Sequence, residues 1–181
     1  MGGKTRAKQE LRRSMRGILT GLDPGFFRAA SAEIRTRIRL PKESRVALFA
    51  ATPGEPQLLD LIIAHPEIEW FLPRVTGTGE MDFLPVSDPQ KLKKGYLGIM
   101  EPTQGSPATD LDFILCPGLA FTREGLRLGQ GGGFYDRALA RFPKAERIGV
   151  AFSCQLVDHL PTAAHDLKMH RVITNLPAPQ D

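Results

Sequence analysis

Short runs of nearly continuous apolar residues recur along the chain, at residues 46–50, 68–72, 111–116 and 147–152. Runs of this length without alternating polar positions are typical of strands buried on both faces of a sheet. Helical segments separate some of them, at residues 56–65 and 134–142. The alternation predicts an α/β fold of one domain over residues 1–181, with a largely parallel central sheet flanked by helices in a Rossmann-like, three-layer arrangement.

One edge strand and two N-terminal helices complete the expected elements. Residues 81–86 form the strand, near an edge because Pro85 cannot donate a ladder hydrogen bond. The first helix has an apolar face of Leu11, Met15, Ile18, Leu19 and Leu22, and its basic residues elsewhere are Lys8, Arg12, Arg13 and Arg16. The second begins after Asp23 as N-cap, with Pro24 at its first position, and ends at Pro41.

Composition places the chain among globular, mildly basic proteins. It has 181 residues, 41% of them hydrophobic, a formal charge of +4 and a pI near 9.3, which suits an anionic partner such as a nucleotide or a nucleic acid. Two cysteines are too few for a disulfide framework. No apolar run has the ~20 residues of a membrane span, and the start lacks the apolar core of a signal peptide. We therefore expect a cytoplasmic protein without membrane contact.

The stretch RLGQGGGFYDR, residues 127–137, contains four glycines beside three charged residues. It lacks the last glycine of a dinucleotide-binding motif and the Gly-Lys-Ser/Thr of a P-loop. It fits a nest of backbone N–H groups at a helix N-terminus, which binds phosphate, with Arg127 and Arg137 beside it and Asp136 available for Mg²⁺. The alternatives are a loop turned by glycines for steric reasons, a favourable first-turn acid and surface salt bridges.

Ligands of such sheets bind beyond the carboxyl ends of the strands. The segments that follow three expected strands contain Glu55, the glycine run and Gln155. The sequence therefore predicts that these three lie along one edge of the sheet. For Glu55 a cap on a helix beginning at Pro56 is the alternative role.

The segment CPGLAFTREGLRLGQGGGFYDRAL closely resembles the signature of the 5-formyltetrahydrofolate cyclo-ligase family, P-G-x-x-F-x-x-x-G-x-R-L-G-x-G-x-G-Y-Y-D. The N-terminal K-x-x-L-R pattern, LFAATPGE, FLPRV, GIMEP and LPTAAHDLKMHRVIT resemble the family's other segments and occur in its order. The K-x-x-L-R pattern alone is unspecific, whereas the glycine signature is strong. The resemblance covers nearly the whole chain.

The resemblance implies a role for individual residues. Those of the ATP site are Lys8, Arg12, Arg127, Gly129, Gln130, Gly131, Gly132, Gly133, Phe134 and Tyr135. Asp136 and Asp166 are the implied Mg²⁺ ligands, a hard oxygen set that this ion prefers. The folate would contact Ala50, Glu55 and Tyr96, with Glu55 accepting hydrogen bonds from the pterin and the aromatic rings packing against flat ligand rings.

The implied reaction is the ATP- and Mg²⁺-dependent conversion of 5-formyltetrahydrofolate, with one or more glutamates, to 5,10-methenyltetrahydrofolate, ADP and phosphate. ATP would phosphorylate the formyl oxygen, N10 would attack the activated carbon, and phosphate would leave. Such chemistry needs positioned charge more than a protein nucleophile, and no residue is assigned as catalytic. Two positions depart from the pattern: Phe134 replaces a usual Tyr, and His170 a common acidic residue, which leaves Asp166 as the ligand of that segment.

A non-catalytic module that binds RNA, or senses a nucleotide, is the competing interpretation. Its support is the basic N-terminal helix, Arg74 and the arginine-flanked glycine loop. Nucleic-acid binding favours a continuous basic surface with interleaved aromatics. The sequence shows no such stripe, and Glu55, Asp136 and Asp166 would repel a phosphate backbone, so we expect a small-molecule partner and no nucleic acid.

Overall fold

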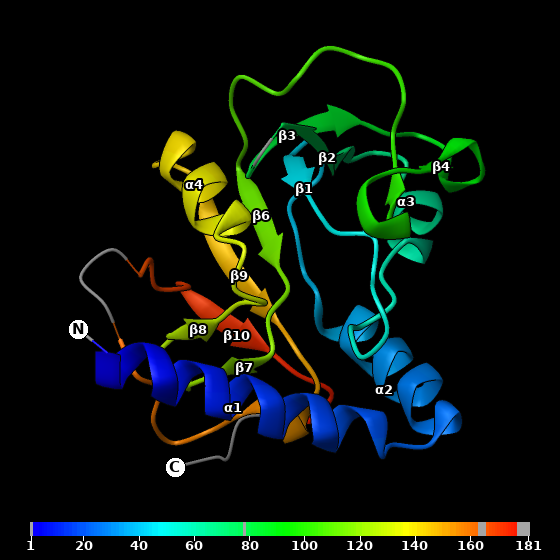
Figure 1. Ribbon diagram of the computed structural model, residues 1–181. Helices are drawn as coiled ribbons and strands as arrows, with labels where there is room; N and C mark the ends of the chain where they lie inside the picture. Colours follow the sequence, from blue (N-terminus) through cyan, green and yellow to red (C-terminus); the bar gives the residue numbers. More distant parts are fainter. Residues whose placement is uncertain (1, 78, 163–165, 177–181) are drawn as a thin grey trace.

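A six-stranded sheet forms the centre of the computed structural model, which describes residues 2–77, 79–162 and 166–176 (Figure 1). Its spatial order is β10 (Arg171–Ile173), β9 (Glu146–Val150), β6 (Phe113–Cys116), β1 (Arg45–Ala47), β2 (Glu69–Gly77) and β3 (Glu80–Pro85). The first five strands are parallel, and β3 pairs antiparallel with β2. The predicted α/β fold with a largely parallel sheet is confirmed.

The expected strands occur close to their predicted positions. Strand β3 lies at the edge of the sheet, as Pro85 predicted. Strand β1 ends at Ala47, although the apolar run continues, and the N–H of Leu48 still donates to the Phe71 carbonyl at 2.9 Å. The sequence analysis missed β10, whose three residues are too few to give a periodic signal.

Two helices precede the sheet, and both were predicted. They are α1 (Gly2–Thr20) and α2 (Pro24–Arg37), and Asp23 caps α2 by accepting from the Gly25 N–H at 2.6 Å. On α1, Met15 and Leu19 are buried, but Ile18 is 45% exposed, so its assignment to the apolar face is wrong. At 3.6 residues per turn, Ile18 lies beside the buried stripe rather than within it.

The later helices are α3 (Asp60–Ala64) and α4 (Phe134–Arg141). The predicted helix over residues 56–65 is shorter than expected: α3 begins at Asp60, and the Gln57 N–H before it donates to the Ser31 hydroxyl on α2 at 3.0 Å. Helix α4 begins where it was predicted. Its Arg141 donates to the Met81 carbonyl of β3 at 3.0 Å, which fixes α4 against the sheet.

Short elements that the sequence did not predict support the loops. Two-stranded ribbons pair β4 (Lys93–Lys94) with β5 (Met100–Glu101) and β7 (Ala120–Phe121) with β8 (Arg127–Leu128). The single-turn 3₁₀ helices are η1 (Pro89–Lys91), η2 (Tyr96–Gly98) and η3 (Ser153–Gln155). Strand β8 leads directly into the glycine loop, so the loop starts from a hydrogen-bonded ribbon.

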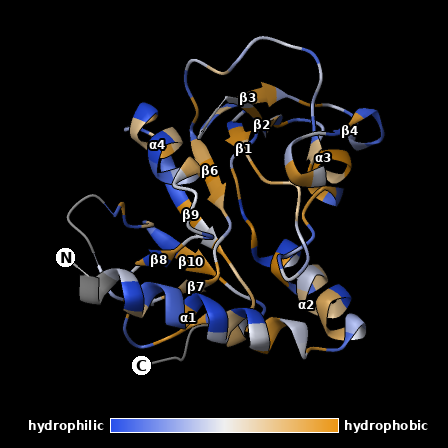
Figure 2. Cartoon of the chain, in the orientation of Figure 1, coloured by the Kyte–Doolittle hydropathy of each residue, from blue (hydrophilic) through white to orange (hydrophobic). Residues whose placement is uncertain are grey.

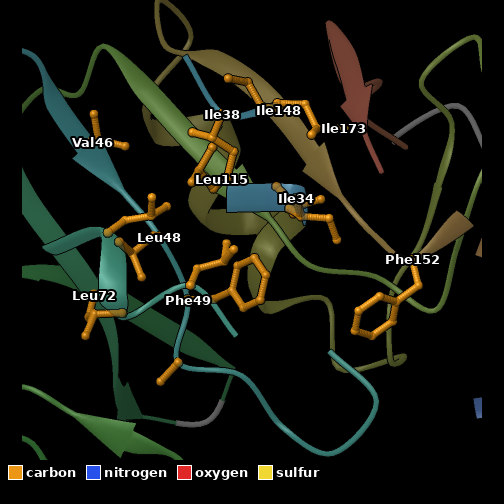
Figure 3. Close-up of a cluster of buried hydrophobic side chains, with 14 of the residues drawn as sticks. Ile34, Ile38, Val46, Leu48, Phe49, Leu72, Leu115, Ile148, Phe152 and Ile173 are labelled. Atoms are coloured by element: carbon orange, nitrogen blue, oxygen red, sulfur yellow. The ribbon is translucent and has the colours of Figure 1, made fainter. Parts of the chain in front are cut away.

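Side chains of opposite parity along the strands form two apolar clusters, one on each face of the sheet. Leu115 belongs to the cluster that includes Ile34 of α2, whereas its neighbours Ile114 and Cys116 belong to the cluster that includes Leu139 of α4. Figure 3 shows the first cluster, where α2 meets the strands. Figure 2 shows apolar residues predominating in β1 and β6 and hydrophilic ones in α1. No helix within the described residues is long and apolar enough to cross a membrane.

Truncating the centre of this core will destabilise the fold. Leu115 is fully buried, and Leu115→Ala is expected to lower the free energy of unfolding by about 2–5 kcal/mol, through lost burial and the cavity that remains. Urea denaturation measures the loss, and the slope of the unfolding free energy against urea concentration should be the same as in the wild type. The control is Ile63→Ala on α3, at a side chain that is 64% exposed, which should change stability by less than about 0.5 kcal/mol. Equal effects in the two variants would contradict the assignment of the core.

Candidate active site

The glycine loop is built to expose backbone N–H groups. Gly131 has φ 112° and Gly133 has φ 68°, conformations that residues with a β-carbon rarely adopt. Gly133 is the N-cap of α4, and no described side chain caps the first turn of this helix. The uncapped N–H groups and the helix dipole together form a site suited to an anion. Gly132 lacks a positive φ, and a β-carbon there would lie 2.9 Å from the Phe134 ring, so its need for glycine is one of space.

Three cations of α1 face this loop and its surroundings, at intervals of four residues along one stripe of the helix. Lys8 Nζ lies 2.7 Å from Asp166 Oδ2. Arg12 Nε donates to the Gly129 carbonyl at 2.9 Å, and Arg16 Nη2 donates to the Gln130 side-chain oxygen at 3.0 Å. Figure 1 shows the reason: α1 runs across the end of the sheet toward which the β6 and β9 arrows point.

The two arginines beside the glycines have different surroundings. The Arg127 side chain is only 5% exposed; its Nη2 lies 2.5 Å from Asp136 Oδ1 and its Nη1 donates to the Pro117 carbonyl at 3.2 Å. Arg137 instead donates to the carbonyls of Gly79 at 2.7 Å and Gly132 at 2.8 Å. Arg127 therefore sits inside the site beside a carboxylate, whereas Arg137 holds the backbone of the loop from outside.

Glu55 lies in the turn that follows β1, and it is 8% exposed. One carboxylate oxygen accepts from the Thr52 N–H at 2.9 Å, which closes the turn. Burial raises the pKa of Glu55, while hydrogen bonds from Thr52 and from the Gln130 side chain act to lower it. Because α3 begins only at Asp60, Glu55 does not cap a helix at Pro56, and that alternative role is wrong. A buried carboxylate tied into a rigid turn is suited to a ligand that donates hydrogen bonds.

Aromatic side chains lie on both sides of the loop. The Arg127 guanidinium stands 5.5 Å from the centroid of the Tyr135 ring. The Tyr135 hydroxyl is buried and has no hydrogen-bond partner in the described part of the chain, and burial raises its pKa well above the usual value. The Phe134 ring lies 5.7 Å from that of Tyr96, which is 46% exposed. The orphaned buried hydroxyl of Tyr135 and the exposed ring of Tyr96 both offer contacts to a ligand.

Comparison with known proteins identifies the family. A family model described as the 5-formyltetrahydrofolate cyclo-ligase family matches residues 4–175. The chain belongs to this family of ligases. The chain is similar to the Escherichia coli K12 protein named 5-formyltetrahydrofolate cyclo-ligase, with 37% identity over 71% of this chain and 76% of that one. A Caenorhabditis elegans protein named probable 5-formyltetrahydrofolate cyclo-ligase shows 30% identity over 92% of this chain and 91% of its own.

Solved structures agree with this membership. The structure of Aquifex aeolicus 5,10-methenyltetrahydrofolate synthetase superposes with a TM-score of 0.83 at 37% identity, covering 93% of this chain and 89% of that chain. A 5,10-methenyltetrahydrofolate synthetase of Mycoplasma pneumoniae has the same fold, with a TM-score of 0.73 at 21% identity. The family resemblance of the sequence is therefore confirmed, and the chain is an enzyme of the cyclo-ligase family.

Most of the residues that the family resemblance implied are linked by contacts in the structure. The ion pairs and hydrogen bonds described above join Lys8 to Asp166, Arg12 to Gly129, Arg127 to Asp136, and Gln130 to Glu55. Ala50 is buried just beyond β1. Tyr96 reaches the loop only through its ring contact with Phe134. Ligand roles for these residues stay predictions, which the family membership makes reasonable.

Gln155 and His170 have structural surroundings. Gln155 is fully buried, its amide nitrogen donates to the Gly118 carbonyl at 2.7 Å, and its oxygen accepts from the Phe152 N–H at 2.7 Å. It therefore joins the ends of two strands and is not available to a ligand. His170 Nδ1 accepts from the Arg147 N–H at 2.8 Å, so it is engaged with the backbone of β9.

Sequence reasoning missed two residues of this region. Arg16 was grouped with the other basic residues of α1, although its spacing of four from Arg12 was a signal that both lie on one face of the helix. Glu101 was not singled out, yet it is 8% exposed and accepts from the Tyr96 N–H at 3.1 Å. Nothing in the local sequence indicated this, because Tyr96 and Glu101 meet only through the β4–β5 ribbon.

The ion pair of Arg127 should contribute more to stability than an ordinary surface pair. Asp136→Asn leaves the buried guanidinium without its counter-charge, and we expect the free energy of unfolding at neutral pH to fall by about 2 kcal/mol. Loss of a first-turn acid alone would cost about 0.3–1 kcal/mol. Asp60→Asn, at a carboxylate that is 76% exposed and 3.2 Å from Arg35, is the control and should change stability by less than about 0.5 kcal/mol. A loss below about 1 kcal/mol for Asp136→Asn, measured by urea denaturation, would contradict this account.

Proposed function

We propose that the protein converts 5-formyltetrahydrofolate to 5,10-methenyltetrahydrofolate in an ATP- and Mg²⁺-dependent reaction that releases ADP and phosphate. The observation that carries the proposal is the glycine loop at the N-terminus of α4, where Arg12 binds the Gly129 carbonyl and Arg127 pairs with Asp136. The Lys8–Asp166 pair adds a further cation and carboxylate one turn away along α1. Family membership supplies the folate, and the arrangement of charge supports MgATP. We also infer that the protein acts in the cytoplasm on a small molecule rather than on nucleic acid.

The phosphates of ATP would bind at residues 129–133 and at the first turn of α4. The N–H groups of this turn have no capping side chain among the described residues. Arg12 donates to the Gly129 carbonyl, Arg127 pairs with Asp136 in the first turn of α4, and Lys8 lies one turn before Arg12 on α1. Together these three cations would neutralise the phosphate charge. Preorganised donors and cations of this kind stabilise the charge that develops during phosphoryl transfer.

Asp136 and Asp166 would hold Mg²⁺ together with phosphate oxygens and water. In the described ranges, no three His, Cys, Asp or Glu side chains form a metal cluster. This donor set fits Mg²⁺, which in phosphoryl-transfer sites is usually bound through one or two carboxylates and completes its shell with phosphate and water. When bound, MgATP supplies the phosphoryl group, and the two aspartates fix its position.

The folate would bind beside Glu55, in the turn after β1. The carboxylate would accept hydrogen bonds from the pterin, and the buried Ala50 would lie against the ring system. The chain offers no competing nucleophile in its cysteines: burial raises the pKa of Cys116 to about 12, so its thiol stays protonated. The reacting oxygen and nitrogen therefore come from the folate, and the protein orients them and limits the access of water.

An absorbance assay tests this function. Protein, 5-formyltetrahydrofolate and MgATP together should produce the absorbance band of 5,10-methenyltetrahydrofolate, whereas ADP in place of ATP should not. Excess EDTA should abolish turnover, and added Mg²⁺ should restore it. Turnover that persisted undiminished in EDTA would contradict the metal dependence. Nucleotide binding without any product would instead favour a nucleotide sensor.

We further propose that the folate carries more than one glutamate. An open pocket lies next to Tyr96 and is lined by Arg74, Lys93, Lys94, Gly95, Glu101, Pro102 and Thr103. Three of these residues, Arg74, Lys93 and Lys94, are cations, and none of them forms an ion pair with a described acidic residue. Glu101 contributes one negative charge to the pocket, but it is largely buried and accepts from the N–H groups of Tyr96 and Val75. The remaining positive charge is suited to the carboxylates of a γ-glutamyl tail.

Removing two of these cations should weaken the binding of long tails selectively. We expect Lys93→Gln with Lys94→Gln to raise the Kd of the triglutamyl substrate by about 5–30-fold, at ~0.5–1 kcal/mol for each of the two exposed charges, and that of the monoglutamyl form much less. The difference should shrink at high salt. Lys91→Gln on η1, at a lysine that is 82% exposed, is the control. Calorimetry measures both Kd values. Equal effects on the two substrates would show that the pocket does not bind the glutamate tail.

A further inference from the structure

Gln130 contacts two elements that carry different parts of the proposed site. On one side, Arg16 Nη2 donates to the Gln130 side-chain oxygen at 3.0 Å and lies 3.4 Å from its main-chain oxygen. On the other side, the Gln130 side chain lies close enough to the Glu55 carboxylate to act as a donor that lowers its pKa. A single side chain therefore joins α1, the glycine loop and the turn after β1.

The chemistry of the three groups fixes the orientation of the amide. A guanidinium can only donate hydrogen bonds, and an ionised carboxylate can only accept them. The amide oxygen must therefore face Arg16, which leaves the NH₂ group to donate to Glu55. The glutamine amide carries a donor and an acceptor at the end of one side chain. Methionine has a similar length but cannot form these two hydrogen bonds, so it is the suitable replacement.

The ends of this chain of contacts are themselves fixed. Glu55 is tied to the Thr52 N–H at 2.9 Å, and Arg16 lies one turn beyond Arg12, which binds the Gly129 carbonyl at 2.9 Å. Gln130 stands between Gly129 and Gly131, in the segment where ATP is proposed to bind. A phosphate that orders this segment would also order the amide that holds Glu55.

We propose that Gln130 is a positioning residue that couples the two substrate sites. A nucleotide on the glycine loop fixes the Gln130 amide, the amide fixes the ionised Glu55 carboxylate for the pterin, and each substrate therefore binds more tightly when the other is present. The identity of the two ligands rests on the proposed function. The coupling rests on the contacts of Gln130 with Arg16 and Glu55.

Calorimetry on the full chain tests the coupling. The Kd of 5-formyltetrahydrofolate is measured with and without a non-hydrolysable ATP analogue and Mg²⁺. In the wild type we expect the analogue to tighten folate binding by about fivefold or more, and folate to tighten analogue binding by the same factor. In Gln130→Met the factor should fall below about twofold, while each ligand alone still binds.

Three further variants separate a positioning role from a structural one. Arg16→Met frees the amide, so it should lose the same coupling, and the double variant should lose no more than either single one. Gln90→Met, at an exposed glutamine on η1, should keep the coupling of the wild type. Thermal unfolding should show that all four variants remain folded.

The pH dependence of folate binding gives an independent readout. Burial raises the pKa of Glu55 and Gln130 acts against this, so removing Gln130 should raise that pKa further. Folate binding needs the ionised Glu55 carboxylate, so folate affinity is lost as the pH falls through the pKa of Glu55. In Gln130→Met the loss should therefore begin at a higher pH. Tyr135, another titratable group near Glu55, stays protonated throughout because burial raises its pKa.

The outcomes distinguish this inference from the function on which it rests. If the wild type binds neither ligand, the proposed function is wrong and the coupling falls with it. If the wild type binds both ligands without mutual effect, or if Gln130→Met keeps the full coupling and the wild-type pH profile, the function stands and the inference is overturned. Loss of coupling in Gln130→Met and in Arg16→Met, but not in Gln90→Met, supports it.

Discussion

The burial of Met15 and Leu19 against the core is the interaction on which the site depends. It fixes α1 across the end of the sheet, and the next stripe of the same helix then holds Lys8, Arg12 and Arg16 over the glycine loop and Asp166. Leu19 also lies against the turn at Gly54, where a β-carbon would come within 3.4 Å of its side chain. One apolar contact thus positions three cations and the turn that carries Glu55.

Charge balance explains why such a site is stable before its ligands bind. The Lys8–Asp166 and Arg127–Asp136 pairs bring together groups proposed for phosphate and for Mg²⁺. Each charge is costly to remove from water unless it has a partner, and within the ligand-free protein the partner is another residue of the site. On the proposed function, phosphate and Mg²⁺ would replace these internal partners together, which agrees with binding as MgATP.

The two proposed substrate sites are neighbours because the strands are parallel. The turn after β1 and the loop that leads to α4 lie at the same edge of the sheet, and side chains of only moderate length bridge them. Family membership defines the class of chemistry. The contacts of Gln130 with Arg16 and Glu55 concern how this particular chain joins the two halves of its site.

The sequence by itself determined the α/β fold, the edge position of β3, the start of α2 at Asp23 and the family, because these depend on local periodicity, proline, caps and a glycine motif. It also named most of the residues that the structure brings together. The ion pair between Lys8 and Asp166, residues separated by most of the chain, was decided only by the tertiary structure. So were the burial of Glu101, the structural role of Gln155 and the bridge made by Gln130. Local patterns report which face of an element is apolar, whereas the partner of a polar side chain depends on which distant segment the packed core places beside it.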